Sequence, residues 1–234
     1  MMAAAGMRSR LETLEVVANN IANLNTAGFK ADREFYNLFL GLEWESPSMP
    51  VLAGSKIDLR QGVLAATGAP LDVGLSGPGF LVVDGPQGPL YTRSGNFRRS
   101  PAGRLETGDG FAVRGVRGPI TLPLGEEVKI GEDGSVAATS GPIDRLQMVE
   151  FAAGAPLAKV GRAYFRAGDA GSARSATRTG VRQGHLEAAN VNPAEAAVRL
   201  IEVQRQFETL ARAVTLVSQD MNRRAIDEIP RTGS

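Results

Sequence analysis

Few residues of this chain have the types and spacing needed for acid–base, nucleophilic or metal chemistry. The 234-residue sequence contains one histidine, His185, and no cysteine. Disulfides, cysteine zinc sites and thiol nucleophiles are therefore excluded, and a histidine-based triad or metal site is hard to build. The carboxylates Asp72, Asp84, Glu106 and Asp109 have no spacing that selects a catalytic pair. We predict no catalytic, metal or cofactor residue and a protein that is not an enzyme.

Two other patterns resemble ligand sites but fit a structural role better. The glycine-rich run Gly74–Gly79 matches neither phosphate-loop spacing, so we interpret it as a turn. Arginines between residues 93 and 117, interleaved with Tyr91, Phe97 and Phe111, could stack on single-stranded nucleic acid. The formal net charge is only +1, which gives no electrostatic attraction to phosphate. We therefore expect these aromatic residues in a core, and no nucleic-acid partner.

The positions of glycine and proline divide the chain into three segments. Of the 28 glycines, 24 lie between Ser46 and Gly184, and 11 of the 13 prolines lie between Pro47 and Pro156. Both residues are unfavourable inside helices and common in turns. The sequence therefore predicts an α+β protein with three domains: an N-terminal helical segment at 1–45, a mainly antiparallel β domain at 46–184, and a C-terminal long helix at 185–234.

The central segment contains short apolar runs separated by turn dipeptides such as Asp84-Gly85 and Asp133-Gly134. These runs predict strands at Phe80–Val83, Leu90–Thr92, Asn96–Arg99, Phe111–Arg114, Glu127–Ile130, Ser135–Ala138, Arg145–Phe151 and Tyr164–Arg166. The small, polar stretch Gly168–Thr179 is expected to be a loop. No run of 18 apolar residues occurs, and the N-terminus is apolar for only seven residues. We therefore expect neither membrane insertion nor a cleaved signal peptide.

Both terminal segments carry apolar residues at the alternating spacings of four and three that are typical of a coiled-coil seam. At the N-terminus these residues are Met7, Leu11, Leu14, Ala18 and Ile21. At the C-terminus they are Ala196, Leu200, Val203, Phe207, Leu210, Val214, Val217 and Met221. Asn192 as N-cap, Pro193 at the first helical position and Glu195 predict a helix over Pro193–Ile229. The alternative is an amphipathic helix packed on its own domain; the length of the seam favours terminal helices that pair as a coiled-coil-like layer.

The segment after the N-terminal seam is rich in asparagine. Four asparagines, Asn19, Asn20, Asn23 and Asn25, fall within seven residues. Their amides could bridge neighbouring subunits in a packed array, or they could cap a frayed helix end. Gly28 is expected to end the helix in the left-handed conformation, and a second short helix is expected over Asp32–Gly41.

Three ordered motifs resemble the bacterial flagellar axial proteins, which include the rod, hook and hook-associated proteins. The first is Ala18–Lys30 (ANNIANLNTAGFK). The second runs from Gly62 to Phe97 and includes a Leu-Asp strand, a Gly-Phe strand and the Tyr91-Thr92-Arg93 turn. The third is Gly184–Glu187 followed by Asn190–Pro193. The stretch Gly118–Leu146 and the ending Arg205–Glu208 are similar to the proximal-rod protein that adjoins the distal rod; a distal-rod or hook protein is the alternative.

This resemblance implies a structural subunit of the flagellar basal-body rod, located in the periplasmic rod and exported without a cleaved signal peptide. Its implied partners are copies of itself, other flagellar rod proteins and the flagellar type III export apparatus. The rival from another class is a β-domain enzyme or carbohydrate-binding protein that acts near peptidoglycan. The residues expected at the assembly interface are Leu11, Leu14, Ala18, Asn19, Asn20, Ile21, Asn23, Asn25, Gly28, Phe29, Asn190, Asn192, Leu200, Val203, Phe207, Leu210, Val214 and Val217.

Overall fold

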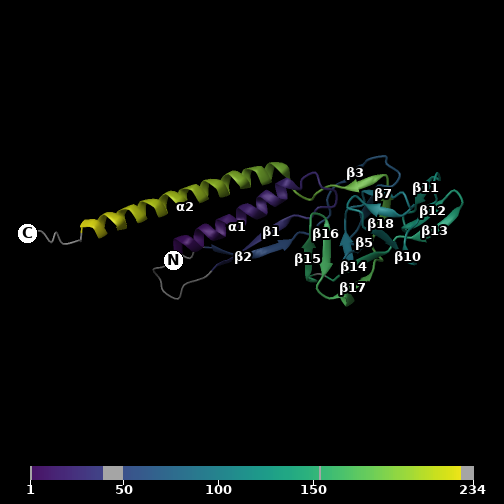
Figure 1. The fold of residues 1–234 in the computed structure, drawn as a ribbon, viewed down its shortest axis with the longest axis horizontal. Coiled ribbons are helices and arrows are strands. Elements are labelled where there is room, and N and C mark those ends of the chain that lie inside the picture. Colours follow the sequence, from purple (N-terminus) through teal and green to yellow (C-terminus); the bar gives the residue numbers. More distant parts are fainter. Residues whose placement is uncertain (1, 39–49, 153, 228–234) are drawn as a thin grey trace, which may run out of the picture. The chain divides into compact units, whose positions relative to one another are not determined.

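A computed structural model of the chain describes residues 2–38, 50–152 and 154–227, which form two compact units (Figure 1). The helical unit takes the described residues within 1–21, 32–56 and 192–234, and the β unit takes those within 22–31 and 57–191. The predicted boundaries at residues 45 and 184 stay a prediction. The compact units differ from them because residues 22–31 and 185–191 group with the strands, and the described residues 50–56 group with the helices.

The C-terminal helix α2 spans Pro193–Asp227 and begins where the local signals predict. The Asn192 side-chain oxygen accepts hydrogen bonds from the backbone N–H groups of Ala194 (3.0 Å) and Glu195 (3.4 Å), so it caps the first turn. The predicted last two residues, 228 and 229, lie outside the described part of the chain. Val203 is fully buried, and the predicted seam residues on either side of it are half-buried.

The N-terminal helix α1 spans Met2–Ala22, but the face that it buries within the chain differs from the predicted seam. Ser9, Thr13 and Val17, spaced four residues apart, are buried. The seam residue Leu11 is 45% exposed and Ala18 is also exposed. Packing inside this chain therefore uses a small, partly polar stripe of α1 and leaves part of its apolar seam uncovered.

The helix predicted over Asp32–Gly41 is wrong, because strand β1 occupies Asp32–Leu38 and pairs with β2 (Pro50–Ile57). The Asn20 side chain makes two hydrogen bonds to the backbone of Asp32, the first residue of β1, as the backbone of a paired strand does. Its amide donates to the Asp32 carbonyl (2.9 Å) and accepts from the Asp32 N–H (3.0 Å). Tertiary hydrogen bonds thus override a helix-like apolar spacing. Residues 39–41 of this prediction lie outside the described residues.

The β unit contains a ten-stranded sheet whose main path runs β15-β16-β6-β5-β9-β8-β7, with β10 on β9, β14 on β5 and β17 on β14. A three-stranded sheet β11-β12-β13 and the pairs β18-β4 and β19-β3 complete it. Every pairing in the described β unit is antiparallel. The strands are β3 (Leu64–Ala66), β4 (Val73–Ser76), β5 (Phe80–Gly85), β6 (Gly88–Thr92), β7 (Phe97–Arg99), β8 (Leu105–Thr107), β9 (Ala112–Gly115), β10 (Gly118–Pro119), β11 (Val128–Ile130), β12 (Ser135–Ala138), β13 (Gly141–Arg145), β14 (Met148–Phe151), β15 (Leu157–Val160), β16 (Tyr164–Ala167), β17 (Ala173–Ser175), β18 (Gly180–Gln183) and β19 (His185–Glu187).

Strand β5 lies between two hydrophobic clusters, because successive side chains of a strand point to opposite faces. Leu81 and Val83 belong to the larger cluster, and Phe80 and Val82 belong to the smaller one. All four side chains are at most 2% exposed. The α+β class with a mainly antiparallel β domain and two terminal helices is therefore confirmed.

The predicted loop over Gly168–Thr179 is partly wrong. It contains a short 3-10 helix, η1 (Ala170–Ser172), and strand β17. Strand β17 forms because its backbone pairs with β14, with Ala173 opposite Phe151. Strand β17 consists mainly of small residues of low strand propensity, so the local sequence does not predict this strand; its pairing with β14 determines it.

The turn predicted at Asp84-Gly85 is also displaced. Both residues pair with β6, and the turn lies at residues 86–87.

Candidate assembly site

Three segments that are far apart in the sequence meet in the β unit. We call these segments, residues 28–31, 58–63 and 187–190, together with Arg93, the clasp. The Gly28 N–H donates to the Glu187 carbonyl (2.7 Å), and the Asp58 N–H donates to the Ala31 carbonyl (2.7 Å). The clasp therefore joins the segment that follows α1 to the segment that precedes α2.

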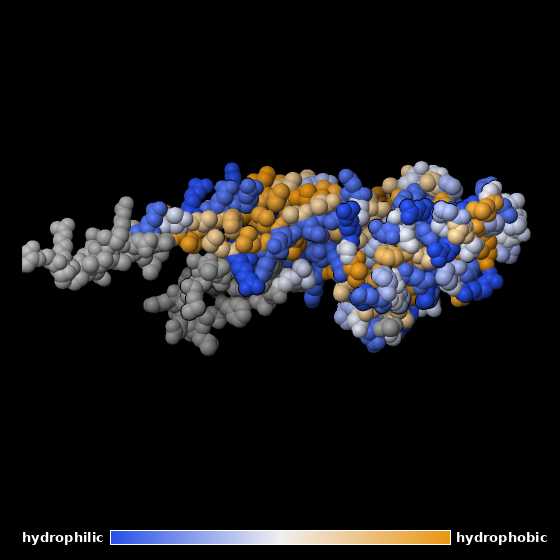
Figure 2. All heavy atoms as spheres, in the orientation of Figure 1, coloured by the Kyte–Doolittle hydropathy of each residue, from blue (hydrophilic) through white to orange (hydrophobic). Residues whose placement is uncertain are grey.

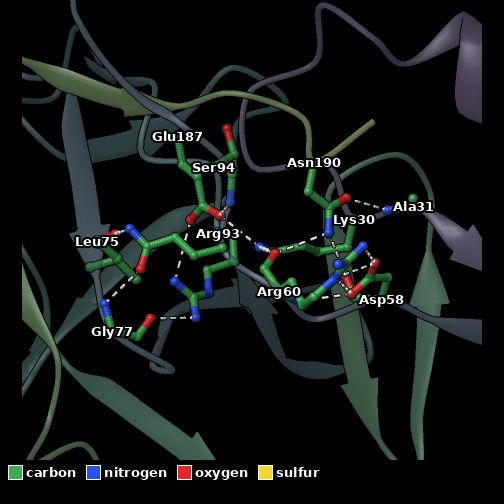
Figure 3. A network of polar contacts seen from close by, with 12 residues as sticks. Lys30, Ala31, Asp58, Arg60, Leu75, Gly77, Arg93, Ser94, Glu187 and Asn190 are labelled. Carbon is green, nitrogen blue, oxygen red and sulfur yellow. Dashed lines mark hydrogen bonds and ion pairs between the residues drawn. The ribbon is translucent and has the colours of Figure 1, made fainter. Parts of the chain in front are cut away.

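The Asn190 side chain ties two of these segments to the third (Figure 3). Its oxygen accepts from the Ala31 N–H (2.7 Å). Its amide nitrogen donates to the carbonyls of Asp58 (2.7 Å) and Arg60 (3.0 Å). One amide thus satisfies three backbone groups, using both of its N–H donors and one acceptor position of its oxygen.

The carboxylate of Glu187 lies at the centre of the polar contacts drawn in Figure 3. One oxygen accepts from Lys30 Nζ (2.6 Å) and from the Gly62 N–H (2.8 Å). The other accepts from an Arg93 guanidinium nitrogen (3.3 Å). Lys30 Nζ also donates to the Arg60 carbonyl (2.6 Å). The side chains of Lys30 and Glu187 are fully buried and that of Arg93 is 1% exposed.

Burial of two cations beside one carboxylate shapes the electrostatics of the clasp. Burial lowers the pKa of Lys30 below its usual value, and the attraction and hydrogen bond of Glu187 oppose this shift without cancelling it. Burial likewise lowers the pKa of Arg93, again opposed by Glu187, but a guanidinium remains charged. The Arg93 guanidinium also lies over the Phe80 ring (5.0 Å to the centroid) and donates to the Gly77 carbonyl (2.7 Å).

Gly28 has the positive φ (68°) that was predicted, but a different role. Helix α1 ends at Ala22, so Gly28 does not terminate it. A Cβ atom at Gly28 would lie 2.3 Å from both the Arg93 carbonyl carbon and the Ser94 nitrogen. Glycine is required here because the turn packs directly on the backbone that carries Arg93.

The asparagine-rich segment makes contacts within its own chain. Asn20 holds Asp32 as described above. Asn23 is buried, and its side-chain oxygen accepts from the Thr26 hydroxyl (3.1 Å) while its carbonyl accepts from the Thr26 N–H (3.0 Å). Asn20 thus binds strand β1 and Asn23 binds Thr26, and whether asparagines of this segment also bridge subunits stays a prediction. Asn19 and Asn25 are exposed.

The residues predicted at an assembly interface fall into three groups by exposure. Buried in their own chain are Asn23, Gly28, Phe29 and Val203. Half-buried are Leu14, Asn20, Ile21, Asn190, Leu200, Phe207, Leu210 and Val214. Exposed are Leu11, Ala18, Asn19, Asn25 and Asn192. The side chain of Val217 lies outside the described part. An assembly role for these residues stays a prediction.

Apolar side chains gather on the surface of the helical unit (Figure 2). On α2, Val198 is 57% exposed, Ile201 is 56% exposed and Leu216 is 62% exposed. Val198 and Leu216 are 18 residues apart, which is five helical turns, so they lie along one line of the helix. This line differs from the seam that buries Val203.

The other candidate sites take ordinary structural roles. The ring of His185 is half-buried and its Nδ1 contacts the Gln183 carbonyl (2.9 Å). Tyr91 and Phe97, expected either to stack on nucleic acid or to pack in the core, are 5% and 6% exposed and belong to the core clusters. Among the described residues, no three histidine, cysteine or acidic side chains are grouped so that they could hold a metal ion.

Sequence reasoning did not single out Lys30, Arg93 and Glu187 as site residues. Each stands inside one of the three motifs that carry the family resemblance, and Lys30 lies between the buried apolar residues Phe29 and Ala31. A charged residue in such a position indicates a buried ion pair, because lysine, arginine and glutamate are rarely buried unless they are paired. Which of them pair with one another depends on the tertiary fold.

Three family models match consecutive parts of the chain. The "Flagella basal body rod protein" model matches residues 2–30, the "Flagellar hook protein FlgE/F/G D1 domain" model matches 74–138, and the "Flagellar basal body rod FlgEFG protein C-terminal" model matches 182–227. Lys30, Arg93 and Glu187 come one from each matched region. The clasp therefore joins all three parts that define the resemblance.

Curated relatives match along most of their length. The flagellar basal-body rod protein FlgF of Salmonella typhimurium is 34% identical over 227 residues, covering 89% of each chain. FlgF of Caulobacter vibrioides is 31% identical, covering 92% of this chain and 91% of the relative. The rod protein FlgG of Bacillus subtilis is 30% identical, covering 90% and 91%. This chain belongs to the flagellar basal-body rod protein family.

Proposed function

We propose that this chain is a structural subunit of the proximal flagellar rod, which self-assembles with its own copies and with other rod proteins through its terminal helices. The family membership supports a structural role in the basal body rather than an enzymatic one. The FlgF relatives cited are 31–34% identical, and the FlgG relative is 30% identical. These values favour the proximal position, with a distal-rod position as the alternative.

The observation that carries the assembly proposal is the uncovered apolar surface of the two helices. After packing within the helical unit, Val198, Ile201 and Leu216 on α2 each remain more than half exposed, and Leu11 on α1 is 45% exposed. Large exposed apolar surfaces are uncommon on soluble monomers and common at subunit interfaces. Coiled-coil-like pairing with helices of neighbouring subunits would bury them.

The expected location is the basal body, and no helix in the described ranges is long and apolar enough to cross a membrane. Export through the flagellar type III apparatus, without a cleaved signal peptide, belongs to the same proposal. It rests on the family resemblance alone.

Deletion of the gene in the source bacterium tests the proposal. Basal bodies purified from the deletion strain should lack a complete rod and hook by electron microscopy. Restoring the gene should restore both, with the chain present in the purified basal bodies. Complete rods and hooks in its absence would overturn the proposal. A rod that stops only at its distal part would favour the distal alternative.

A further inference from the structure

The clasp buries two cations, Lys30 and Arg93, around the single carboxylate of Glu187 (Figure 3). Two other carboxylates attract these cations more weakly than Glu187 does, Asp58 for Lys30 and Glu150 for Arg93. Asp58 also contacts the Arg60 guanidinium (2.8 Å), and Glu150 contacts Arg178 (3.3 Å). A buried charge without a contacting partner is costly. Burial of the Lys30 ammonium is therefore unfavourable until Glu187 lies beside it.

The backbone of the clasp shows the same mutual dependence. The Gly28 N–H is satisfied by the Glu187 carbonyl (2.7 Å), and the Ala31 N–H is satisfied by the Asn190 side chain (2.7 Å). Segment 28–31 thus donates both of these backbone hydrogen bonds to segment 187–190. If either segment left, the other would keep buried backbone groups without partners, which proteins avoid.

We propose that Glu187 is a latch that makes segments 28–31 and 187–190 dock on the β unit in one cooperative step. The two segments are the attachment points of α1 and α2. The latch therefore orders both attachment points together, and the β unit is complete only when both are in place. The inference rests on contacts inside the β unit and does not depend on the proposed assembly function.

The charges of the clasp distinguish this latch from a set of independent hydrogen bonds. Glu187→Gln keeps the shape of the side chain but removes the carboxylate that contacts both buried cations. Lys30→Met removes one cation, and Arg93 still pairs with Glu187. In the double variant Lys30→Met/Glu187→Gln, only one cation, Arg93, has lost its contacting carboxylate. Independent hydrogen bonds would make the double variant the worst of the three, whereas the latch makes it milder than Glu187→Gln.

Amide hydrogen exchange on the full-length chain tests the latch. The Ala188 N–H donates to the Val63 carbonyl (2.8 Å), so it reports on the docking of segment 187–190. In Glu187→Gln we expect exchange at Gly28, Ala31 and Ala188 to rise together by at least tenfold. In Lys30→Met it should change by less than threefold, and in the double variant it should be at least threefold slower than in Glu187→Gln. Glu106→Gln is the matched control: this residue is 8% exposed, and the side chain of its partner, Arg104, is 55% exposed. The control should leave the three amides within twofold of the wild type.

A second variant keeps the proposal testable if Glu187→Gln fails to fold. Asn190→Ala removes the acceptor of the Ala31 N–H without touching the charges. The latch predicts that exchange at Gly28 and Ala188 rises by a similar factor to that at Ala31. A rise confined to Ala31 would overturn the proposal, and so would a double variant that exchanges faster than Glu187→Gln.

Discussion

The Lys30 ammonium lies 2.6 Å from the Glu187 carboxylate although 157 residues separate them in the sequence, and both side chains are fully buried. Lys30 follows α1 closely and Glu187 shortly precedes α2. An ion pair inside the β unit therefore joins a residue that follows α1 to a residue that precedes α2. A subunit whose helices are used for assembly gains fixed attachment points from this arrangement.

Gly28→Ala should destabilise the chain far more than Gly68→Ala. Both glycines have a positive φ, 68° and 71°, so both substitutions carry a strain of about 1 kcal/mol. Only at Gly28 would the new methyl group meet backbone atoms, 2.3 Å away; nothing lies within 4 Å at Gly68. We expect Gly28→Ala to cost a further ~1–3 kcal/mol. Urea denaturation measures both, and equal midpoints would contradict the close approach.

Stability should fall in acid partly because of Glu150. Burial raises the pKa of this carboxyl, but hydrogen bonds from the Arg178 backbone, the Thr179 hydroxyl and the Arg178 guanidinium outweigh burial and hold the pKa below its usual value of 4.5. A carboxyl with a lowered pKa in the folded state contributes stability that is present above the unfolded pKa. This stability is lost as the pH falls through the folded pKa.

Denaturation midpoints between pH 3 and 7 test this contribution. The wild type should lose more stability than Glu150→Gln as the pH falls below about 4.5. Parallel pH profiles for the two chains would show that Glu150 does not contribute in this way.

Asn190 and Asn192 lie close together in the sequence but have different structural roles, so their substitutions should differ in their effect on stability. Asn192 is an exposed cap, so Asn192→Ala should cost about 1 kcal/mol. Asn190→Ala leaves the groups at Ala31, Asp58 and Arg60 without their side-chain partner, at a cost of about 1–3 kcal/mol. The free energy of unfolding from urea titrations gives both values. A larger loss at Asn192 would argue against the clasp.

Substitutions at Val203 and Leu216 on α2 should distinguish an effect on folding from an effect on assembly. Val203 is fully buried and Leu216 is 62% exposed. Val203→Ala should lower the stability of the isolated chain by about 2 kcal/mol through lost burial. Leu216→Ala should change it by less than about 0.5 kcal/mol yet reduce incorporation into basal bodies. The proposal fails at this position if Leu216→Ala incorporates as well as the wild type.

Local sequence signals were sufficient for α2 and for many of the strands. Asn192 and Pro193 mark the start of α2 because capping depends on adjacent residues alone. Strand β12 follows Asp133-Gly134, a turn signal that also depends on neighbours. Strand β5 lacks the alternation of apolar and polar residues that is typical of a half-buried strand. Both of its faces are buried, and Phe80–Val83 are all apolar.

Features that depend on distant partners were not predictable. Apolar spacing predicts a helix where strand β1 lies, because the amide of Asn20 and the pairing with β2, which decide its conformation, leave no local signal. The pairing of Lys30 and Arg93 with Glu187 has no local signal of its own. The positive φ predicted for Gly28 is confirmed. Glycine is required there because the turn packs against the Arg93 backbone, not because α1 ends there.

Cross-linking from Leu216 tests the assembly proposal most directly. The sequence has no cysteine, so Leu216→Cys introduces a single reactive thiol into an otherwise cysteine-free chain. In isolated basal bodies, a short cross-linker that joins this thiol to nearby lysines should link the chain covalently to a neighbouring subunit. The purified monomer at the same concentration should give no linked product. A thiol that remains unlinked and fully accessible to a bulky maleimide in assembled basal bodies would contradict assembly through this face of α2.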